Sequence, residues 1–139
     1  MNAAFNTLTF AKVDPVWNVD QARTMAVKIA ASLTLPAGQI LGEATASPGI
    51  YEDYDSGASD GTEVPKAILQ YAIETDANGI PTNFIGPFGV GVPAPLAVPA
   101  WTSGEFKTTD LTGSIAGAIT AKWMRLEQGN ATTGVVAIS

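Results

Sequence analysis

Residues 48–76 alternate short apolar runs with turn-forming residues, and this pattern restricts the chain to short strands. Apolar runs at Ile50–Tyr54 and Ala67–Ile73 flank an acidic loop that contains the Asp60-Gly61 dipeptide. Glycine adopts φ > 0 without a steric penalty, and an Asp side chain can bond its own backbone in a turn. We therefore predict two strands that form a loop-connected pair, and not a catalytic turn between a strand and a helix.

Other segments show the same β character. Apolar residues at a spacing of two predict a strand over residues 24–33, with Lys28 on its polar side. A second short strand is predicted over residues 39–45, between two turns that contain Pro and Gly. β structure is expected to restart at residues 102–106, and residues 135–138 are predicted to form a closing strand.

From Asp110 onward, the spacing of apolar residues changes to that of a helix. The residues that recur at this spacing are Leu111, Ile115, Ile119, Trp123 and Leu126. Thr112 or Ser114 can cap the start of such a helix, and Gly129 can end it. The predicted fold is therefore α+β or mainly β: a small single domain of short mixed strands with one principal helix near the C-terminus.

The N-terminal residues 1–22 are expected to form an extended arm, followed by a domain over residues 23–139. Apolar residues of the arm are scattered among polar ones without a clear period. One interpretation is a loosely packed terminus. The other is an adhesive arm, because exposed aromatic side chains indicate a covering partner. The expected contact residues of the arm are Phe5, Leu8, Phe10, Val13 and Trp17.

A Pro- and Gly-rich segment at about residues 80–100 carries no charged residue. Repeated Pro and Gly would break helical hydrogen bonding, so a membrane-spanning helix is not expected there. Two interpretations stay open: a loop packed over the domain's own core, or a contact between subunits, since prolines that fix φ in advance reduce the entropy lost on association. The residues expected in a subunit contact are Phe84, Phe88, Leu96 and Trp101.

The composition argues against catalysis, metal binding and nucleic-acid binding. The chain has no histidine and no cysteine, and its net charge is −6 with only seven Lys and Arg. It therefore lacks the commonest general base, thiolate ligands and the clustered cations that a phosphate backbone requires. The acidic cluster of residues 52–63 does not match a calcium loop, since Val64 stands where the bidentate Glu is needed. We expect no enzyme activity, no catalytic residues, no cofactor and no metal site.

Several short motifs follow one another along the chain. They are Pro36–Gly42, the Ser-Asp-Gly-x-x-Val sequence of Ser59–Val64 leading into Ala67–Leu69, Ser103–Phe106, and the apolar tail Gly134–Ser139. In this order and spacing, over about residues 35–76 and 103–139, the chain resembles the head decoration protein D family of lambda-like phages. The segment at 80–100 has no obvious counterpart in that family, and the arm shows no clear family motif.

The resemblance implies a structural protein that binds the major capsid protein. Members of the family form trimers that bind the expanded capsid at three-fold and quasi-three-fold sites and stabilise it against the pressure of packaged DNA. Their N-terminal arm adds a strand to a coat-protein sheet. The implied location is the outer surface of the virion, and the host cytoplasm before assembly, with no direct nucleic acid or membrane partner. The alternative is a small β-rich carbohydrate- or ligand-binding module of a phage tail or adhesin.

Overall fold

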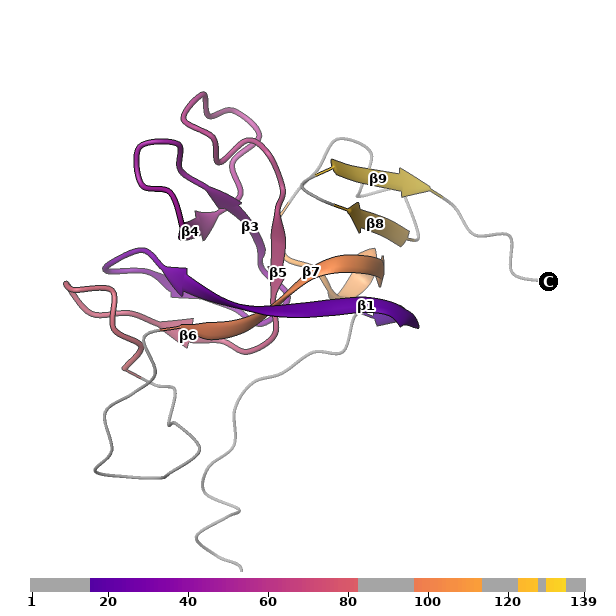
Figure 1. The fold of residues 1–139 in the computed structure, drawn as a ribbon, viewed down its shortest axis with the longest axis horizontal. Helices are drawn as coiled ribbons and strands as arrows, with labels where there is room; N and C mark the ends of the chain where they lie inside the picture. The colour runs from indigo at the N-terminus through magenta and orange to yellow at the C-terminus, as the bar shows by residue number, and fades with distance from the viewer. Residues whose placement is uncertain (1–15, 83–96, 114–122, 128–129, 135–139) are drawn as a thin grey trace, which may run out of the picture.

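The computed structural model describes residues 16–82, 97–113, 123–127 and 130–134, and β-strands make up nearly all of the regular secondary structure among them (Figure 1). The strands are β1 (Val16–Ile29), β2 (Thr34–Leu35), β3 (Ile40–Glu43), β4 (Ile50–Asp53), β5 (Ala67–Leu69), β6 (Ile73–Glu74), β7 (Val98–Lys107), β8 (Trp123–Glu127) and β9 (Asn130–Gly134). A short 3₁₀ helix, η1 (Thr108–Asp110), follows β7. No helix in this part of the chain is long and apolar enough to cross a membrane.

Five strands close into a ring. β1 pairs in parallel with β4, and antiparallel pairing then runs from β4 to β3, β5 and β7, and from β7 back to β1. The parallel contact is short and joins Lys28 to Ile50 and Ile29 to Tyr51. Closure gives each of these strands two neighbours, which removes exposed backbone edges over the length of the ring.

Two of the ring strands continue beyond the ring, and the part of the seven-stranded sheet that they form there with β8 and β9 is called the extension sheet. It consists of β1, β7, β8 and β9 in that order, and β1 and β7 run side by side from the ring into it (Figure 1). Where the two parts meet, residues 19–22 of β1 lie opposite Gly104 alone, which is a large bulge. Gly104 has φ +135°, and a Cβ there would lie 3.0 Å from the Cα of Ala22, so glycine is required at this crossing.

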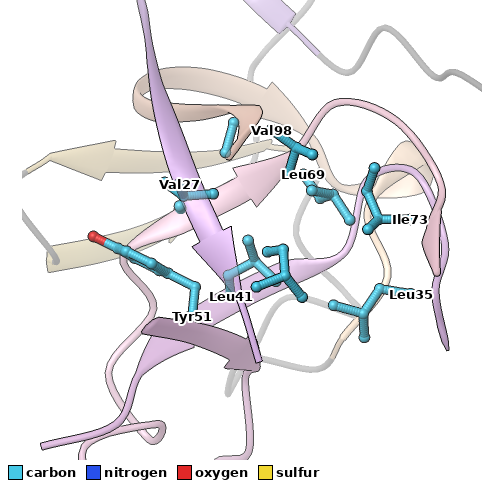
Figure 2. Packing of buried hydrophobic residues seen from close by; sticks show 10 residues of the cluster. Val27, Leu35, Leu41, Tyr51, Leu69, Ile73 and Val98 are labelled. Atoms are coloured by element: carbon cyan, nitrogen blue, oxygen red, sulfur yellow. The ribbon is translucent and has the colours of Figure 1, made fainter. Parts of the chain in front are cut away.

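The ring encloses the first hydrophobic cluster. All five ring strands contribute to it, and Leu35 and Ile73 from the small β2–β6 sheet add to it (Figure 2). Leu41 and Leu69 are fully buried, whereas the hydroxyl of Tyr51 points out of the cluster. The cluster consists of Val27, Ile29, Leu35, Leu41, Tyr51, Ala67, Leu69, Ile73, Val98 and Ala100.

A second hydrophobic cluster lies between the ring and the extension sheet. It contains Ile40, Ile68, Trp101, Phe106, Met124 and Leu126. Sequence neighbours such as Ile68 and Leu69 therefore enter different clusters, because successive side chains of a strand point to opposite faces. This two-sided burial explains why β5 is a continuous apolar run, Ala-Ile-Leu, with all three residues buried.

The prediction of one principal C-terminal helix is wrong, and the fold is mainly β. After η1, Leu111 is extended, with φ −100° and ψ 148°, and Trp123–Glu127 is a strand paired with β7. Met124 and Leu126 are buried while Arg125 and Glu127 are exposed, which is a period of two. The central part of the predicted helix, residues 114–122, lies outside the described residues. Residues 123–127 therefore form a strand because they pair with β7, although the spacing of their apolar residues also fits a helix.

The predicted pairing of the two strands around the acidic loop is also wrong. β4 and β5 are each neighbours of β3, which lies between them in the sheet. Several predicted strands are confirmed in part: β1 covers residues 24–29 of the predicted 24–33, β4 covers 50–53 of the predicted 50–54, β3 lies within 39–45, and β7 includes 102–106. The single strand predicted over Ala67–Ile73 is wrong, because β5 ends at Leu69 and Ile73 begins β6 in a different sheet. The predicted closing strand at residues 135–138 lies outside the described residues.

Replacing Trp101 by alanine tests the second cluster. Trp101 is 7% exposed, and its ring centroid lies 5.9 Å from that of Phe106. We expect Trp101→Ala to lower the free energy of unfolding by about 3–5 kcal/mol, the usual range for emptying a buried aromatic site. Urea denaturation measures this change, and Trp101→Phe, which keeps an aromatic ring in place, is the control. A loss below about 1 kcal/mol for the alanine variant would contradict the role of Trp101 in the core.

Candidate functional site

The acidic loop between β4 and β5 uses its own carboxylates to close its turns. Asp55 accepts the backbone N–H of Gly57 at 2.9 Å. Asp60 accepts both the backbone N–H of Thr62, at 3.1 Å, and its hydroxyl, at 2.6 Å. These bonds from Thr62, the hydroxyl first, lower the pKa of Asp60. Glu63 accepts the N–H two residues before it at 2.7 Å. The loop therefore keeps these carboxylates bonded to its own backbone.

Two glycines allow this loop to lie directly on β3. Gly61 has φ +108°, and a Cβ there would lie 2.5 Å from the Oγ1 of Thr45. A Cβ on Gly42 would lie 2.5 Å from the carbonyl oxygen of Thr62. The close approach is held by a hydrogen bond from the N–H of Thr45 to the carbonyl of Asp60, at 2.7 Å. The Asp-Gly of the Ser59–Val64 motif is thus required for backbone packing.

An ion pair joins the same loop to the β3–β4 turn. Lys66 Nζ lies 2.9 Å from Glu43 Oε1, and Glu43 Oε2 accepts the N–H of Gly49 at 2.8 Å. The hydrogen bond from Lys66, followed by that from Gly49, lowers the pKa of Glu43, and the same pair raises the pKa of Lys66. Nearby, burial is the main cause of the raised pKa of Tyr51. The ion pair of Glu43 and Lys66 therefore ties the acidic loop to the end of β3.

The described residues contain no group of three or more His, Cys, Asp or Glu that could hold a metal ion. In the same part of the chain, every buried side-chain nitrogen and oxygen atom has a hydrogen-bond partner. Within the described part of the chain, the polar groups of the acidic loop are therefore arranged to hold turns and strands together.

The structure places the beginning of β1 inside the expected arm. β1 starts at Val16, so residues 16–22 belong to a strand of the extension sheet. Trp17 is part of β1, although its side chain lies outside the described part of the structure. The other expected contact residues of the arm, Phe5, Leu8, Phe10 and Val13, lie outside the described residues.

Among the described strands, β1 pairs only with β7 between Val16 and Val27, which leaves its other edge open. Next to the ring, this edge also exposes the side chain of Met25, with 47% of its surface accessible. An open edge presents backbone N–H and C=O groups that can pair with another strand. No local sequence signal identified this edge, because strand order depends on distant residues.

The four residues expected in a subunit contact are not brought together in the described structure. Trp101 is buried in the second cluster and contacts Phe106. Phe84, Phe88 and Leu96 lie outside the described residues. The segment at 80–100 ends within β7, because Val98, Pro99 and Ala100 pair with Val27, Ala26 and Met25 of β1.

No protein-family model matches the chain, and neither the curated proteins nor the solved structures contain a significantly similar protein. The described residues therefore form a mainly β domain with a five-stranded ring and an acidic loop fixed by its own hydrogen bonds. Among the described strands, the outer edges of β1 and β9 in the extension sheet are unpaired.

Replacing Gly61 tests the contact between the acidic loop and β3. Gly61→Ala forces a side chain into the left-handed region and against Thr45, so we expect a loss of roughly 2–4 kcal/mol in unfolding free energy. Gly57→Ala is the matched control: its Cβ would lie 3.4 Å from the Oδ1 of Asp55, and we expect a change within about 0.5 kcal/mol. Guanidinium denaturation measures both. Equal losses in the two variants would contradict the contact.

The Glu43–Lys66 pair predicts acid-sensitive stability. Because the pKa of Glu43 is below its ordinary value of 4.5 in the folded state, its contribution is present above pH 4.5 and is lost as the pH falls through the folded pKa. Glu43→Gln is expected to lose less stability than the natural protein between pH 5 and pH 3. The effect is small, because the Lys66 side chain is 37% exposed and screened by solvent.

Urea midpoints measured across this pH range test the pair. Lys66→Gln is the control variant, since it removes the partner and keeps the carboxylate. We expect Lys66→Gln to reduce the acid sensitivity in the same direction, and the double variant to add little to either single change. Additive effects of the two substitutions would show that the two residues act independently.

Proposed function

We propose that this protein is a capsid decoration protein similar to the head decoration protein D family of lambda-like phages. In this role, it binds the major capsid protein on the outer surface of the expanded head as a trimer and reinforces the shell without catalysis. One observation supports this proposal. The motifs on which the resemblance is based contact one another in the fold, as far as the structure describes them. The principal helix predicted near the C-terminus is not part of the proposal.

Backbone contacts connect these motifs. Residues 36–42 and 67–69 are joined by hydrogen bonds from Gly38 N to Leu69 O, at 2.8 Å, and from Leu69 N to Gln39 O, at 2.9 Å. The Ser59–Val64 loop lies on Gly42, as described above. Ile68 pairs with Trp101 of β7, the strand that also contains residues 103–106. The order and spacing of these motifs thus correspond to one packed unit, which supports treating the resemblance as more than coincidence.

The edge of β1 gives independent support. In the sequence, residues 1–15 directly precede β1, whose outer edge is open among the described strands. An open edge can pair with a strand of another protein, with backbone bonds supplying affinity. The exposed Met25 on the same strand offers apolar surface to such a partner. This arrangement suits the attachment of a small domain to a larger protein shell.

Attachment of a trimer to the capsid through its three arms would be multivalent. Three arms on one trimer raise the effective concentration for binding, so that each single contact can be weak. A protein that binds only the expanded shell stabilises that state by mass action. The net charge of −6 is unfavourable for direct contact with packaged DNA, which fits a location on the outside of the shell.

Deleting residues 1–15 tests the arm. Because β1 begins at Val16, this deletion leaves the described sheet complete, so we expect an unchanged melting temperature and loss of binding to expanded heads. The binding assay mixes the protein with undecorated heads of the phage that encodes it, and counts copies per shell after sedimentation. Unexpanded heads and the complete chain are the controls.

Different outcomes would contradict the decoration function and the role of the arm. If the complete chain does not bind expanded heads, the decoration function is wrong. If the shortened chain keeps its occupancy on expanded heads, the function stands and the role of the arm is wrong. A shift in melting temperature with calcium or glycans would instead favour a ligand-binding module.

A further inference from the structure

The turn that follows β6 contains Asn78-Gly79, the one asparagine-glycine pair in the sequence. The backbone nitrogen that follows an asparagine can attack its side-chain amide carbon, and a Cβ on the following residue hinders this approach. Glycine has no Cβ and adopts backbone conformations that other residues avoid. Ring closure is therefore least hindered at Asn78. The other asparagines, each followed by a residue with a side chain, are Asn2, Asn6, Asn18, Asn83 and Asn130.

The fold leaves the Asn78 side chain accessible. Ala77 and Asn78 are both exposed, so water reaches the amide. The hydrogen bond that Asn78 makes within the described residues comes from its backbone N–H, which donates to Oδ1 of Asp76 at 2.8 Å. Among these residues, no partner holds the side-chain amide away from the nitrogen of Gly79.

One hydrogen bond opposes the reaction. The N–H of Gly79 donates to the carbonyl oxygen of Asp76 at 3.0 Å, and this bond must open before the nitrogen can attack. It lies in a turn whose central residues, Ala77 and Asn78, are exposed. Opening an exposed turn needs only a small part of the global unfolding free energy. The bond therefore slows the attack and does not prevent it.

A second pair of this type, Asp60-Gly61, shows how the same fold can prevent such a reaction. The carboxylate of Asp60 accepts the N–H and the hydroxyl of Thr62, which lower its pKa and keep it ionised, and an ionised carboxylate is a poor electrophile. The N–H of Gly61 donates to Oε2 of Glu63 at 2.7 Å, and a carboxylate partner opposes loss of this proton. The Asn78-Gly79 turn has a neutral amide as electrophile and a backbone carbonyl as the acceptor of the N–H.

We propose that Asn78 is a site of spontaneous deamidation, at which the folded protein is converted into aspartate and isoaspartate forms. The nitrogen of Gly79 loses its proton and bonds to Cγ of Asn78, the amide leaves as ammonia, and a succinimide ring results. Water then adds to one of the two ring carbonyls. Breaking the bond between the nitrogen and Cγ gives aspartate, and breaking the bond between the nitrogen and the main-chain carbonyl carbon gives isoaspartate. No oxidation or reduction takes place, and the reaction is independent of the decoration function.

The two products are expected to differ in their effect on the fold. Aspartate keeps the length of the main chain and adds a negative charge to the net charge of −6. Isoaspartate lengthens the main chain by a methylene between residues 78 and 79. The turn is closed by a hydrogen bond from the N–H of Asp76 to the carbonyl of Ile80, at 3.0 Å. A Cβ on Gly79 would lie 3.1 Å from the carbonyl oxygen of Ile29, so this turn lies close to the end of β1. A longer main chain is therefore expected to loosen this contact.

Incubation of the complete, folded protein at mildly alkaline pH tests the proposal, because loss of the backbone proton speeds ring closure. Mass spectrometry of proteolytic peptides detects the conversion of amide to acid, and methylation by an isoaspartate-specific methyltransferase identifies the isoaspartate form. We expect conversion at Asn78 to be at least about ten-fold faster than at any other asparagine, which requires a barrier lower by only about 1.4 kcal/mol. Asn78→Gln is the matched control, since it keeps a neutral amide on the turn while its longer side chain closes a ring much more slowly.

The same measurement in urea separates the effect of the fold from that of the sequence. Conversion of Asn78 in the unfolded chain but not in the folded protein would overturn the proposal, because the hydrogen bond of Gly79 would then be protective. Equally fast conversion of another asparagine in the folded protein would also overturn it. After separation by ion exchange, the isoaspartate form should melt at a lower temperature than the Asn78→Asp variant. Equal melting temperatures would contradict the expected loosening of the turn.

Discussion

The antiparallel ladder between β1 and β7 holds the two parts of this domain together. Its first part, from Val27–Val98 to Thr24–Trp101, closes the ring, and its second part, beyond the bulge, starts the extension sheet. Both hydrophobic clusters depend on β7, because Ala100 enters the ring and the neighbouring Trp101 enters the second cluster. The bulge opposite Gly104 lets the two strands continue from one part into the other, since a bulge bends its strand and increases the local twist.

Local features of this fold could be predicted from the sequence, and long-range features could not. The turn at Gly38 and the Asp60-Gly61 turn were identified because φ > 0 is a local property of glycine, and both glycines have positive φ. The strand β1 was found from the spacing of Val27 and Ile29 around Lys28. The pairing of β4 with β5 was predicted wrongly, because the position of β3 between them depends on which apolar faces meet across the chain.

The error in the helix prediction has a related cause. A spacing of three separates Trp123 from Leu126, which fits a helix, while the alternation of Met124 and Leu126 fits a strand. Five residues are too few for periodicity to decide between the two. The hydrogen bonds and apolar cover offered by β7 decide it, and these depend on residues 104–107, about twenty positions earlier in the chain. The open edges could not be predicted for the same reason, because they depend on the order of strands and therefore on residues far apart in the sequence.

The acidic loop and the strand edges together indicate where binding can arise in this molecule. Asp55 and Asp60 accept hydrogen bonds from their own loop, and Glu43 is engaged by Lys66 and Gly49, so these groups are already used for the fold. The backbone groups along the outer edges of β1 and β9 have no partner strand in the described structure. Backbone pairing carries little sequence specificity, and its selectivity must come from neighbouring side chains and from geometry. Among the described residues, the outer edges of β1 and β9 are therefore the places where a strand of another protein could pair, and side chains beside those edges would have to supply the selectivity.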